Sequence, residues 1–553
     1  MKNANHDTAA SEVDLGETAV ETLREKQVSD GASLSSTGPR APGRTPGNDD
    51  VSLEAAPCPY RGSGTERDPY VVEWLPGDPD NPANFPVARK WALVLLGTLG
   101  ALAVCLISSA YSASAPQLKA EFGCTTLQFN AGVSLYVFGF AVGPALWAPL
   151  SEMYGRRVIF VATSCAMAVF VAATAGARNM ASVLVFRFLT ATFGAAPLSN
   201  GGGVAADLFG ALERGLALSV FGSAPFLGPT LGPIIGGFVS MNVGWRWVQG
   251  VCAIFAGVVF LLLTFFMRET YAPTLLRRTA ARLSRETGKV YVSTLDHGNK
   301  GRSEPAQLFA RALGRPWVML FREPIVLISS VYMAILYGTL YMLFPAFPIV
   351  YGQLRGWNPG VGSLPFLGIT AGMLLGIAYC MLDDRFRYQK IARARVAAPE
   401  DRLPPAMVGA AAIPAGLFAF AWTNAPGIHW AVSVSLCAPF AFGTVLVFTA
   451  LFNYQLDAYA VFAASVLAAG AILRALVGGA FPLFTTYMYR DLGIHWASSV
   501  PAFLTVLCLP FPFVMYRYGA RIRMRCKMAA EAAELLDRLR AADNNDDNND
   551  GDA

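Results

Sequence analysis

Residues 149–160 read PLSEMYGRRVIF and separate two runs of about twenty mostly apolar residues. Glu152, Arg156 and Arg157 stand close together here, although the chain keeps charge out of both flanking runs. Gly155 permits a tight turn between the acidic and the basic residues. What these charges do depends on what the flanking runs are.

The chain has the composition of an integral membrane protein. Of its 553 residues, 54% are hydrophobic and 15% are charged, and the mean hydropathy is +0.42. Soluble domains carry about 25% charged residues, so a soluble protein of this composition could not cover its apolar surface. The nine cysteines lie singly, without paired spacing, and we therefore expect no metal ion and no other cofactor.

Hydropathy predicts twelve membrane-spanning helices. Each candidate is long enough to cross about 30 Å of hydrocarbon, and a span must satisfy its own backbone hydrogen bonds, which favours helix. The predicted spans cover residues 91–112, 129–149, 158–177, 181–204, 215–239, 246–266, 325–349, 361–382, 406–423, 429–452, 460–485 and 496–516.

A long polar segment divides the spans six and six, which predicts an all-α membrane protein with two six-helix halves. That is the plan of a rocking transporter with its site between the halves. Lys and Arg concentrate in the central loop, in residues 383–404 and near the C-terminus, so we expect both termini in the cytoplasm. The predicted parts are a disordered cytoplasmic tail (1–89), an N-terminal half (90–266), a cytoplasmic central loop (267–324), a C-terminal half (325–516) and a cytoplasmic C-terminal tail (517–553).

The opening charges would then lie in the cytoplasmic turn between spans 2 and 3. The turn after span 8, LDDRFRYQK, repeats the combination of acid and base at the same place in its half. Such charges can pair across to the other half when the cytoplasmic side closes. The alternative is that Arg156 and Arg157 only set the orientation. We predict a cytoplasmic gate formed by Glu152, Gly155, Arg156 and Arg157.

This stretch resembles the loop 2–3 signature of the major facilitator superfamily. Ala148 stands where that signature has glycine, Glu152 where it has aspartate, and Met153 where it has its first basic residue. The form PLSExYGRR is similar to the fungal branch of the twelve-span drug:proton antiporters. The resemblance extends from about Trp74 to Tyr518, and it implies the major facilitator fold for the whole membrane region.

Two arginines are placed inside predicted spans. Arg187 is alone in the apolar span 4, where an arginine is costly and marks a functional site. The alternative is that it snorkels to the outer interface. It resembles the span-4 arginine of the family, which implies a role in proton coupling, although Ala191 stands where the family usually has glycine. Arg474, near the middle of span 11, is the second coupling candidate.

Span 5 contains GPTLGPIIGGF (228–238). Gly228, Gly232 and Gly236 recur every four residues, so they share one helix face and let a neighbouring backbone approach. Prolines 229 and 233 should bend the helix. A generic packing seam would explain this spacing, but the segment also resembles the antiporter motif G-P-x-x-G-G, which implies an exporter. That motif is met at Gly232, Pro233, Gly236 and Gly237.

Smaller features support the same reading. DLFGALERG (207–215) resembles the family's turn between spans 4 and 5, and it supplies Asp207, Glu213 and Arg214. Most aromatic residues in spans face lipid or core, but a few should line a substrate cavity. The best candidates are Tyr111, Tyr337 and Tyr341.

No acidic residue lies near the middle of a predicted span, so proton coupling is implied by the resemblance alone. A cavity without embedded acids suits neutral or anionic amphiphiles better than polycations, which argues against a polyamine pump. No catalytic set of side chains lies within the spans, and no G-x-x-x-x-G-K-[ST] loop is present, so we expect neither an enzyme nor ATP-driven transport.

The sequence thus predicts a secondary transporter in the plasma membrane that exports amphipathic small molecules in exchange for protons. Drugs, toxins and secondary metabolites are the expected substrates. The expected partners are these substrates, protons and the lipid bilayer, with no nucleic acid, and the chain is expected to be a monomer. One alternative is a nutrient or polyamine importer or facilitator on the same fold. Another is a non-transporting receptor, which would not need two repeated halves.

Overall fold

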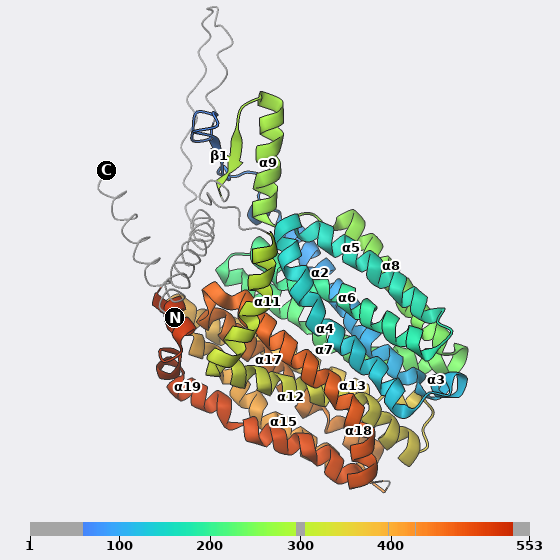
Figure 1. Cartoon of the computed structure of the whole chain (residues 1–553). Coiled ribbons are helices and arrows are strands. Elements are labelled where there is room, and N and C mark those ends of the chain that lie inside the picture. The colour runs from blue at the N-terminus through green and yellow to red at the C-terminus, as the bar shows by residue number, and fades with distance from the viewer. Residues whose placement is uncertain (1–58, 295–304, 396, 426, 535–553) are drawn as a thin grey trace, which may run out of the picture. The chain divides into compact units, whose positions relative to one another are not determined.

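The computed structural model describes residues 59–294, 305–395, 397–425 and 427–534 (Figure 1). The described residues form two compact units. One combines residues 59–86 with residues 269–294. The other holds residues 87–268 and residues 305–534, and it is the helical bundle.

The N-terminal part of the bundle consists of long helices joined by short turns (Figure 1). Gly155 and Gly244 make two of these turns possible, since they have φ of 97° and 94°, a region that glycine adopts readily. The short helix α3 (Ala115–Phe122) follows α2 through a 3-10 turn. The six long helices are α2 (Val87–Ala110), α4 (Thr126–Tyr154), α5 (Arg156–Ala175), α6 (Met180–Leu208), α7 (Ala211–Val243) and α8 (Trp245–Phe266).

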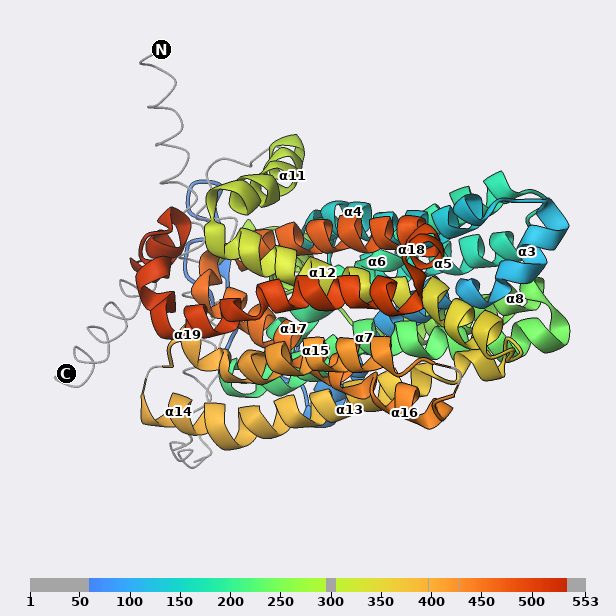
Figure 2. The same ribbon diagram turned by 90° about the horizontal axis from the view of Figure 1, so that it is seen from below.

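The C-terminal part repeats this arrangement (Figure 2). Its long helices are α12 (Pro324–Phe347), α13 (Phe366–Asp383), α15 (Pro404–Trp422), α17 (Ala438–Ala458), α18 (Ala463–Cys508) and α19 (Pro510–Arg523). Helix α11 (Pro305–Arg322) precedes them, and the short helices α14 (Gln389–Ala394) and α16 (Trp430–Ser435) connect them. π-helical turns at Pro348–Leu354 and Asp384–Tyr388 extend α12 and α13.

Eleven apolar helical segments in the described residues are long enough to cross a membrane. The last of them consists of two helices. It runs over 59 residues, Ser465–Arg523, which as a straight helix would be about 90 Å long, roughly twice the thickness of a bilayer. Gly493 interrupts it with φ 75° and ψ 166°. The hydroxyls of Tyr489 and Ser498 lie 2.8 Å apart across this glycine, whereas a straight helix would separate these residues by about 14 Å. The chain therefore reverses at Gly493, so this segment supplies two of the apolar helices of the bundle in the described residues.

The two halves meet along two helix pairs. Helix α4 packs on α18, and α7 packs on α13; within the halves, α2 packs on α7 and α12 on α18. We call the end of the bundle that carries the turn from α4 to α5 the motif end. The other end, at which α6 begins, is called the opposite end.

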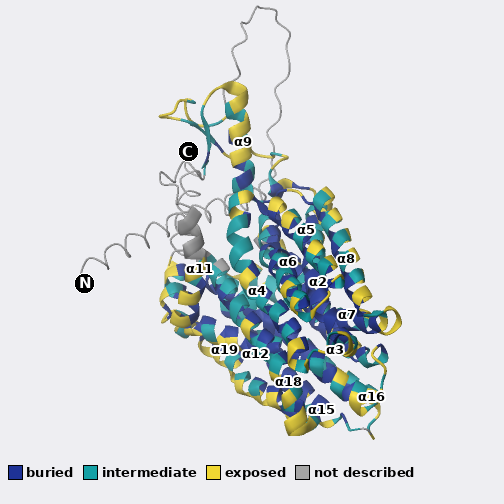
Figure 3. Ribbon diagram, turned by 45° about the vertical axis from the view of Figure 1, so that its right-hand side comes forward, coloured by how far each residue is buried: buried dark blue, intermediate teal, exposed yellow. Residues whose placement is uncertain are grey.

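Figure 3 shows that buried and exposed residues alternate along the helices of the bundle, and many of the exposed ones are large and apolar. Large apolar side chains are highly exposed on the outside, among them Phe265 at 76% and Leu507 at 78%. The inside holds fully buried small residues such as Ala101 and Ala195. Helices that are apolar on both their inward and their outward faces are typical of a bundle surrounded by lipid.

The smaller unit joins the N-terminal segment to the central loop. Strand β1 (Tyr70–Val72) pairs in parallel with β2 (Tyr291–Ser293), and α9 (Ala272–Thr287) packs on β2. Val72, Leu276 and Ala280 form a buried cluster. The prediction of a disordered tail over residues 1–89 is therefore wrong for residues 59–86, and α2 begins at Val87. Residues 1–58 lie outside the described residues.

Candidate functional site

The PLSEMYGRR stretch forms the end of α4, a glycine turn and the start of α5. Arg156 is the first residue of α5, and its side chain turns inward, leaving 7% of the residue exposed. Its Nη1 donates to Ser151 Oγ at 2.6 Å and to Asn200 Oδ1 at 3.3 Å. Its Nε lies 3.5 Å from the carboxylate of Asp207. Arg156 thus braces α4, α5 and α6 within one half.

Glu152 and Arg157 lie on the exposed side of the same turn. Arg157 donates from Nη2 to the carbonyl oxygen of Thr264 near the end of α8, at 3.3 Å. Both residues have further interactions. The gate predicted for this stretch therefore has two parts, a buried arginine that braces its own half and two surface charges. Its function as a gate stays a prediction.

The turn between α6 and α7 places Asp207, one of the residues predicted from this turn, next to the residues of the predicted gate. Asp207 is the ion-pair partner of Arg156, so these two predicted elements adjoin. Glu213 is exposed in the first turn of α7. Arg214 is half-buried, and its Nε has no hydrogen-bond partner among the described residues.

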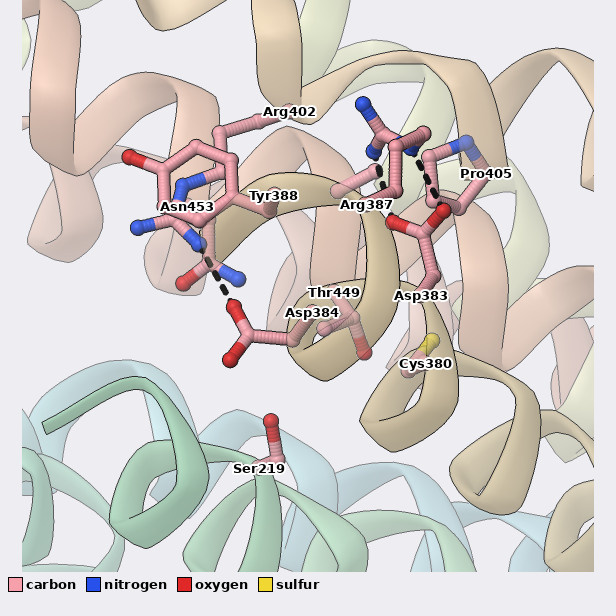
Figure 4. Close-up of a pocket in the computed structure, with 11 residues that line it drawn as sticks. Ser219, Cys380, Asp383, Asp384, Arg387, Tyr388, Arg402, Pro405, Thr449 and Asn453 are labelled. Carbon is pink, nitrogen blue, oxygen red and sulfur yellow. Dashed lines mark hydrogen bonds and ion pairs between the residues drawn. The ribbon is translucent and has the colours of Figure 1, made fainter. Parts of the chain in front are cut away.

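The corresponding turn of the other half carries a larger charge cluster (Figure 4). Asp383 accepts two hydrogen bonds from Arg387, each of 2.6 Å. Arg402 donates to Asp384 at 3.1 Å and to Asp457 at 3.0 Å, so it bridges two carboxylates. Each of these charges has an opposite charge beside it, and the cluster joins α13, α17 and the loop between α14 and α15.

This cluster also borders the first half. Ser219 of α7 and the cluster line the same small cavity of about 30 Å³ (Figure 4), which is room for a water molecule or two. A methyl group at Gly215 would lie 3.3 Å from Oδ1 of Asp384, so that carboxylate adjoins the first turns of α7. The N-terminal turn of a helix carries partial positive charge and favours an anion. At the motif end, the halves therefore meet through Asp384.

Arg187 is buried inside the bundle and is held by residues of its own half. It is 1% exposed, its Nε donates to the carbonyl of Gly132 on α4 at 2.7 Å, and its Nη2 donates to the carbonyl of Ser108 on α2 at 2.8 Å. The guanidinium lies 3.9 Å from the ring centre of Tyr111 and 4.7 Å from that of Tyr136, within the range of cation–π attraction. Nη1 has no hydrogen-bond partner, and no carboxylate of the described residues pairs with this arginine.

A short chain of hydroxyl groups joins this arginine site to the other half. Ser108 Oγ lies 3.1 Å from the hydroxyl of Tyr341 on α12, and Tyr337 donates to Tyr341 at 3.4 Å. Of the predicted cavity residues, Tyr111 and Tyr341 are fully buried and Tyr337 is half-buried. Tyr111 covers Arg187, whereas Tyr337 and Tyr341 extend the polar contact across the boundary between the halves.

Arg474 lies on α18 and faces aromatic rings. Its guanidinium carbon is 5.5 Å from the ring centre of Phe448 on α17, and Phe448 packs edge to face on Phe226 of α7, with ring centres 5.2 Å apart. An added Cβ on Gly478, four residues after Arg474 on α18, would lie 2.7 Å from the ring of Tyr337, so this tyrosine packs on α18 one turn from Arg474. Within the described part of the chain, Arg474 has no hydrogen bond and no ion pair, and it is half-buried.

The glycines of the predicted antiporter motif on α7 face two different neighbouring segments. Gly228, Gly232 and Gly236 face α2, where an added Cβ would meet residues 105–110; on Gly228 it would lie 2.5 Å from the Cβ of Cys105. An added Cβ on Gly236 would meet the backbone of Ala110. Pro233 stands inside α7 without ending it. The seam with α2 thus lies within one half.

Contacts between the halves also exist at the opposite end. Gly237 turns away from α2, and an added Cβ would lie 2.6 Å from Oγ of Ser363, which precedes α13. Asn130 of α4 donates to the carbonyl of Pro482 at 2.9 Å and to the hydroxyl of Thr486 at 3.2 Å, both on α18. The halves therefore touch at both ends of the bundle.

A family model described as Major Facilitator Superfamily matches residues 97–482. The chain belongs to the major facilitator superfamily. It is 53% identical over 509 residues to the major facilitator-type transporter sorT of Penicillium rubens, covering 92% of this chain and 96% of that one. It is 54% identical over 494 residues to the MFS-type efflux pump MFS2 of Trichophyton rubrum, covering 89% and 83%. It is 55% identical over 483 residues to the multidrug transporter mdrA of Aspergillus fumigatus, covering 87% and 79%.

Solved structures of this superfamily share the fold. The partially occluded inward-open form of the xylose transporter XylE from E. coli aligns with a TM-score of 0.56 and 16% identity, covering 78% of this chain and 98% of XylE. The predicted all-α major facilitator fold is confirmed, and so is the prediction of a membrane-spanning transporter rather than an enzyme. The described residues contain no cluster of three or more His, Cys, Asp or Glu that could hold a metal ion.

Two buried carboxylates of this major facilitator bundle escaped the sequence reasoning. Glu323 at the start of α12 is 1% exposed, and it accepts hydrogen bonds from the hydroxyl of Tyr459 at 2.9 Å and from the backbone N–H of Met528 at 3.0 Å. Glu400 is 8% exposed and lies 3.4 Å from Nε of Arg523. Both attach the C-terminal segment to the motif end. Most of their partners lie more than a hundred residues away in the chain, so no local pattern indicates them.

Proposed function

We propose that this chain is a secondary exporter of amphipathic small organic molecules, such as drugs, toxins or secondary metabolites. It works as a monomer in the plasma membrane, with both termini in the cytoplasm, and exchanges its substrate for protons. The observation that carries the proposal is the likeness to relatives named as an efflux pump and a multidrug transporter. The match is 54–55% identical and extends over 79–83% of their length.

Export by this fold alternates between two openings. Loading from the cytoplasm requires the contact between Asp384 and the start of α7 to separate at the motif end. Release requires the contacts of Asn130 and Gly237 to separate at the opposite end. Glu152 and Arg157 are placed on the surface of the motif end, where a latch has to act. The glycine seam between α7 and α2 supplies a smooth surface along which these helices can tilt.

Arg187 is our first candidate for coupling. It holds α2 and α4 to α6, and through Ser108 it reaches Tyr341 on the other half. A movement of α12 relative to α2 therefore acts directly on the group that holds this arginine. A proton-dependent step can use this connection without a carboxylate in the same place.

Efflux from a yeast that lacks its main pumps tests this proposal. Cells expressing the chain are loaded with fluorescent amphiphiles, and retention is followed before and after the proton gradient is collapsed. We expect lower retention that depends on the gradient and is lost in Arg187→Ala at equal surface expression. Arg490→Ala, an exposed arginine at the opposite end, should behave like the wild type. Higher accumulation than in control cells would instead identify an importer.

A further inference from the structure

We infer that the interior of this bundle recognises anions, with Arg474 as the group that binds a carboxylate head of the transported molecule. Tyr337, whose ring packs against Gly478 of α18 one turn from Arg474, and Tyr341 supply further hydroxyl groups along the same path. This inference rests on the proposed function, because it names the substrate class of the same transport path. It also predicts which amphiphiles the chain rejects.

The first observation is the distribution of charge. Arg187 and Arg474 lie inside the bundle, and no carboxylate of the described residues forms an ion pair with either of them. Burying a charge without a counter-ion is unfavourable, so an anion that enters this interior is stabilised and a cation is repelled. The following carboxylates form ion pairs, and each lies near the end of a membrane-spanning helix or outside such helices: Glu121, Asp207, Asp383, Asp384, Glu400, Asp401, Asp457, Asp491 and Glu531.

The second observation is the surroundings of Arg474. Arg474 is half-buried, and its guanidinium lies against the ring of Phe448, which is itself 5% exposed, so this side of the arginine faces the inside of the bundle. Its planar N–H donors have no hydrogen-bond partner within the described ranges of the chain, and their geometry matches the two oxygens of a carboxylate. Phe448 and Phe226 form an aromatic wall beside it. A charged group next to aromatic rings is what an amphiphile with an acidic head requires.

The third observation is that the chain of hydroxyl groups that starts at Tyr337 leads to the second arginine of the interior, Arg187. Tyr337, Tyr341 and Ser108 connect the surroundings of Arg474 with Arg187, whose buried Nη1 has no partner among the residues that the structure describes. Buried donors are almost always satisfied, so this N–H is a second place for a carboxylate oxygen. Arg474 follows the motif-end start of α18 by eleven residues, and Arg187 follows the opposite-end start of α6 by seven. A head group that passes from Arg474 to Arg187 therefore moves in the direction of export.

Three probes with one apolar body separate charge from hydrophobicity. They are 4-(1-pyrenyl)butanoate, the corresponding alcohol and the corresponding primary amine, which is a cation at pH 7. Binding of each probe to the purified full-length protein in nanodiscs of uncharged lipid is measured by pyrene fluorescence, with empty nanodiscs subtracted. We expect the butanoate to bind at least tenfold more tightly than the amine, with the alcohol in between.

Substitutions locate the site. Arg474→Gln should weaken butanoate binding about tenfold and leave alcohol binding within a factor of two, and Arg474→Lys should restore part of the preference. Arg187→Gln should reduce the preference too, in protein whose thermal melting shows that it is folded. Arg490→Gln is the matched control on the same helix, with an exposed arginine at the opposite end, and should change nothing. Equal binding of the three probes, or a preference that survives Arg474→Gln, would overturn the inference.

The same probes distinguish this inference from the proposed function. Export of all three probes by cells, regardless of charge, would support the proposed exporter and contradict the anion site. Tight, Arg474-dependent binding of the butanoate without export in cells would support the anion site and contradict the proposed direction of transport.

Discussion

The motif end and the interior of the bundle both contain arginine side chains, and the two regions stabilise these charges in different ways. At the motif end, Arg402 lies between two carboxylates and Arg387 is paired with a third. In the interior, Arg187 is held by two carbonyl groups and two aromatic rings, and Arg474 by one ring. The motif end is thus stabilised by paired charges that can separate and form again in water. The interior is stabilised by close packing and by neutral hydrogen-bond acceptors, and no carboxylate of the described residues compensates its positive charge.

Arg187→Ala should have the largest effect. It removes two hydrogen bonds from a charged donor, each contributing about 1.5–3 kcal/mol, and it leaves a cavity beneath Tyr111 and Tyr136. We expect transport to fall to background and the melting temperature to drop by several degrees. The measurement is efflux at matched surface expression together with thermal melting of the purified protein. A variant with normal transport would show that the interior arginine is dispensable.

Arg402→Gln should come next. Asp384 and Asp457 would lose their shared partner, and because these groups are partly exposed we expect a loss of about 2 kcal/mol. The effect on thermal melting should shrink at high salt, since ions screen such pairs. Arg395→Gln, whose side chain is 55% exposed beside Asp401, is the matched control and should cost less than about 0.5 kcal/mol. Equal effects of the two variants would contradict the importance of the bridge.

Gly236→Ala tests packing in the interior rather than charge. The added methyl group would meet the backbone of Ala110, so α7 and α2 would have to separate at a cost of about 1–3 kcal/mol. We expect reduced efflux and an effect on melting that does not depend on salt. Gly222→Ala on the same helix meets nothing within 4 Å and should be neutral or slightly stabilising. Similar losses in both variants would indicate a general intolerance of the helix.

Tyr341→Phe should give the smallest change. It removes the hydroxyl that connects α12 to Ser108, a neutral hydrogen bond worth about 1 kcal/mol, and efflux should fall several-fold. The control is Tyr332→Phe on the same helix, because the hydroxyl of Tyr332 is buried without a partner in the described residues. That control should be neutral or stabilising. An unchanged efflux rate in Tyr341→Phe would show that the chain of hydroxyl groups takes no part in transport.

Most of the fold could be predicted from the sequence, because lipid imposes a strong pattern on spans. The apolar runs gave twelve crossings, including the two that Gly493 separates. The N-terminal strand could not be predicted, since three residues, Tyr70–Val72, are a weak signal and their partner strand lies about 220 positions later. Only the central loop gives this short segment something to pair with.

The candidate site was predictable as a set of unusual residues, but not as a geometry. Arg187 stands out because arginine is costly in an apolar helix, yet its acceptors are backbone carbonyls that no side-chain pattern reveals. Arg156 was expected to act with Glu152 and Arg157, but it turns inward to Asn200 and Asp207. Asp384 beside Gly215 joins residues of different halves, and a single sequence does not indicate such a pairing.

Arg187 and Arg474 form no ion pair with an acidic residue in the described part of the chain, and this gives the transport cycle an electrical asymmetry. A bundle that has bound a monoanion beside Arg474 has neutralised one positive charge, whereas the empty bundle carries that charge uncompensated. In a cell that is negative inside, the membrane potential then acts on the return of the empty carrier and draws its positive interior back toward the cytoplasmic opening. In addition to the charge of any proton that enters in exchange, one negative charge leaves the cell in each cycle, and 100 mV contributes about 2.3 kcal/mol to that movement. Voltage alone would therefore sustain a gradient of an exported acid of roughly fiftyfold.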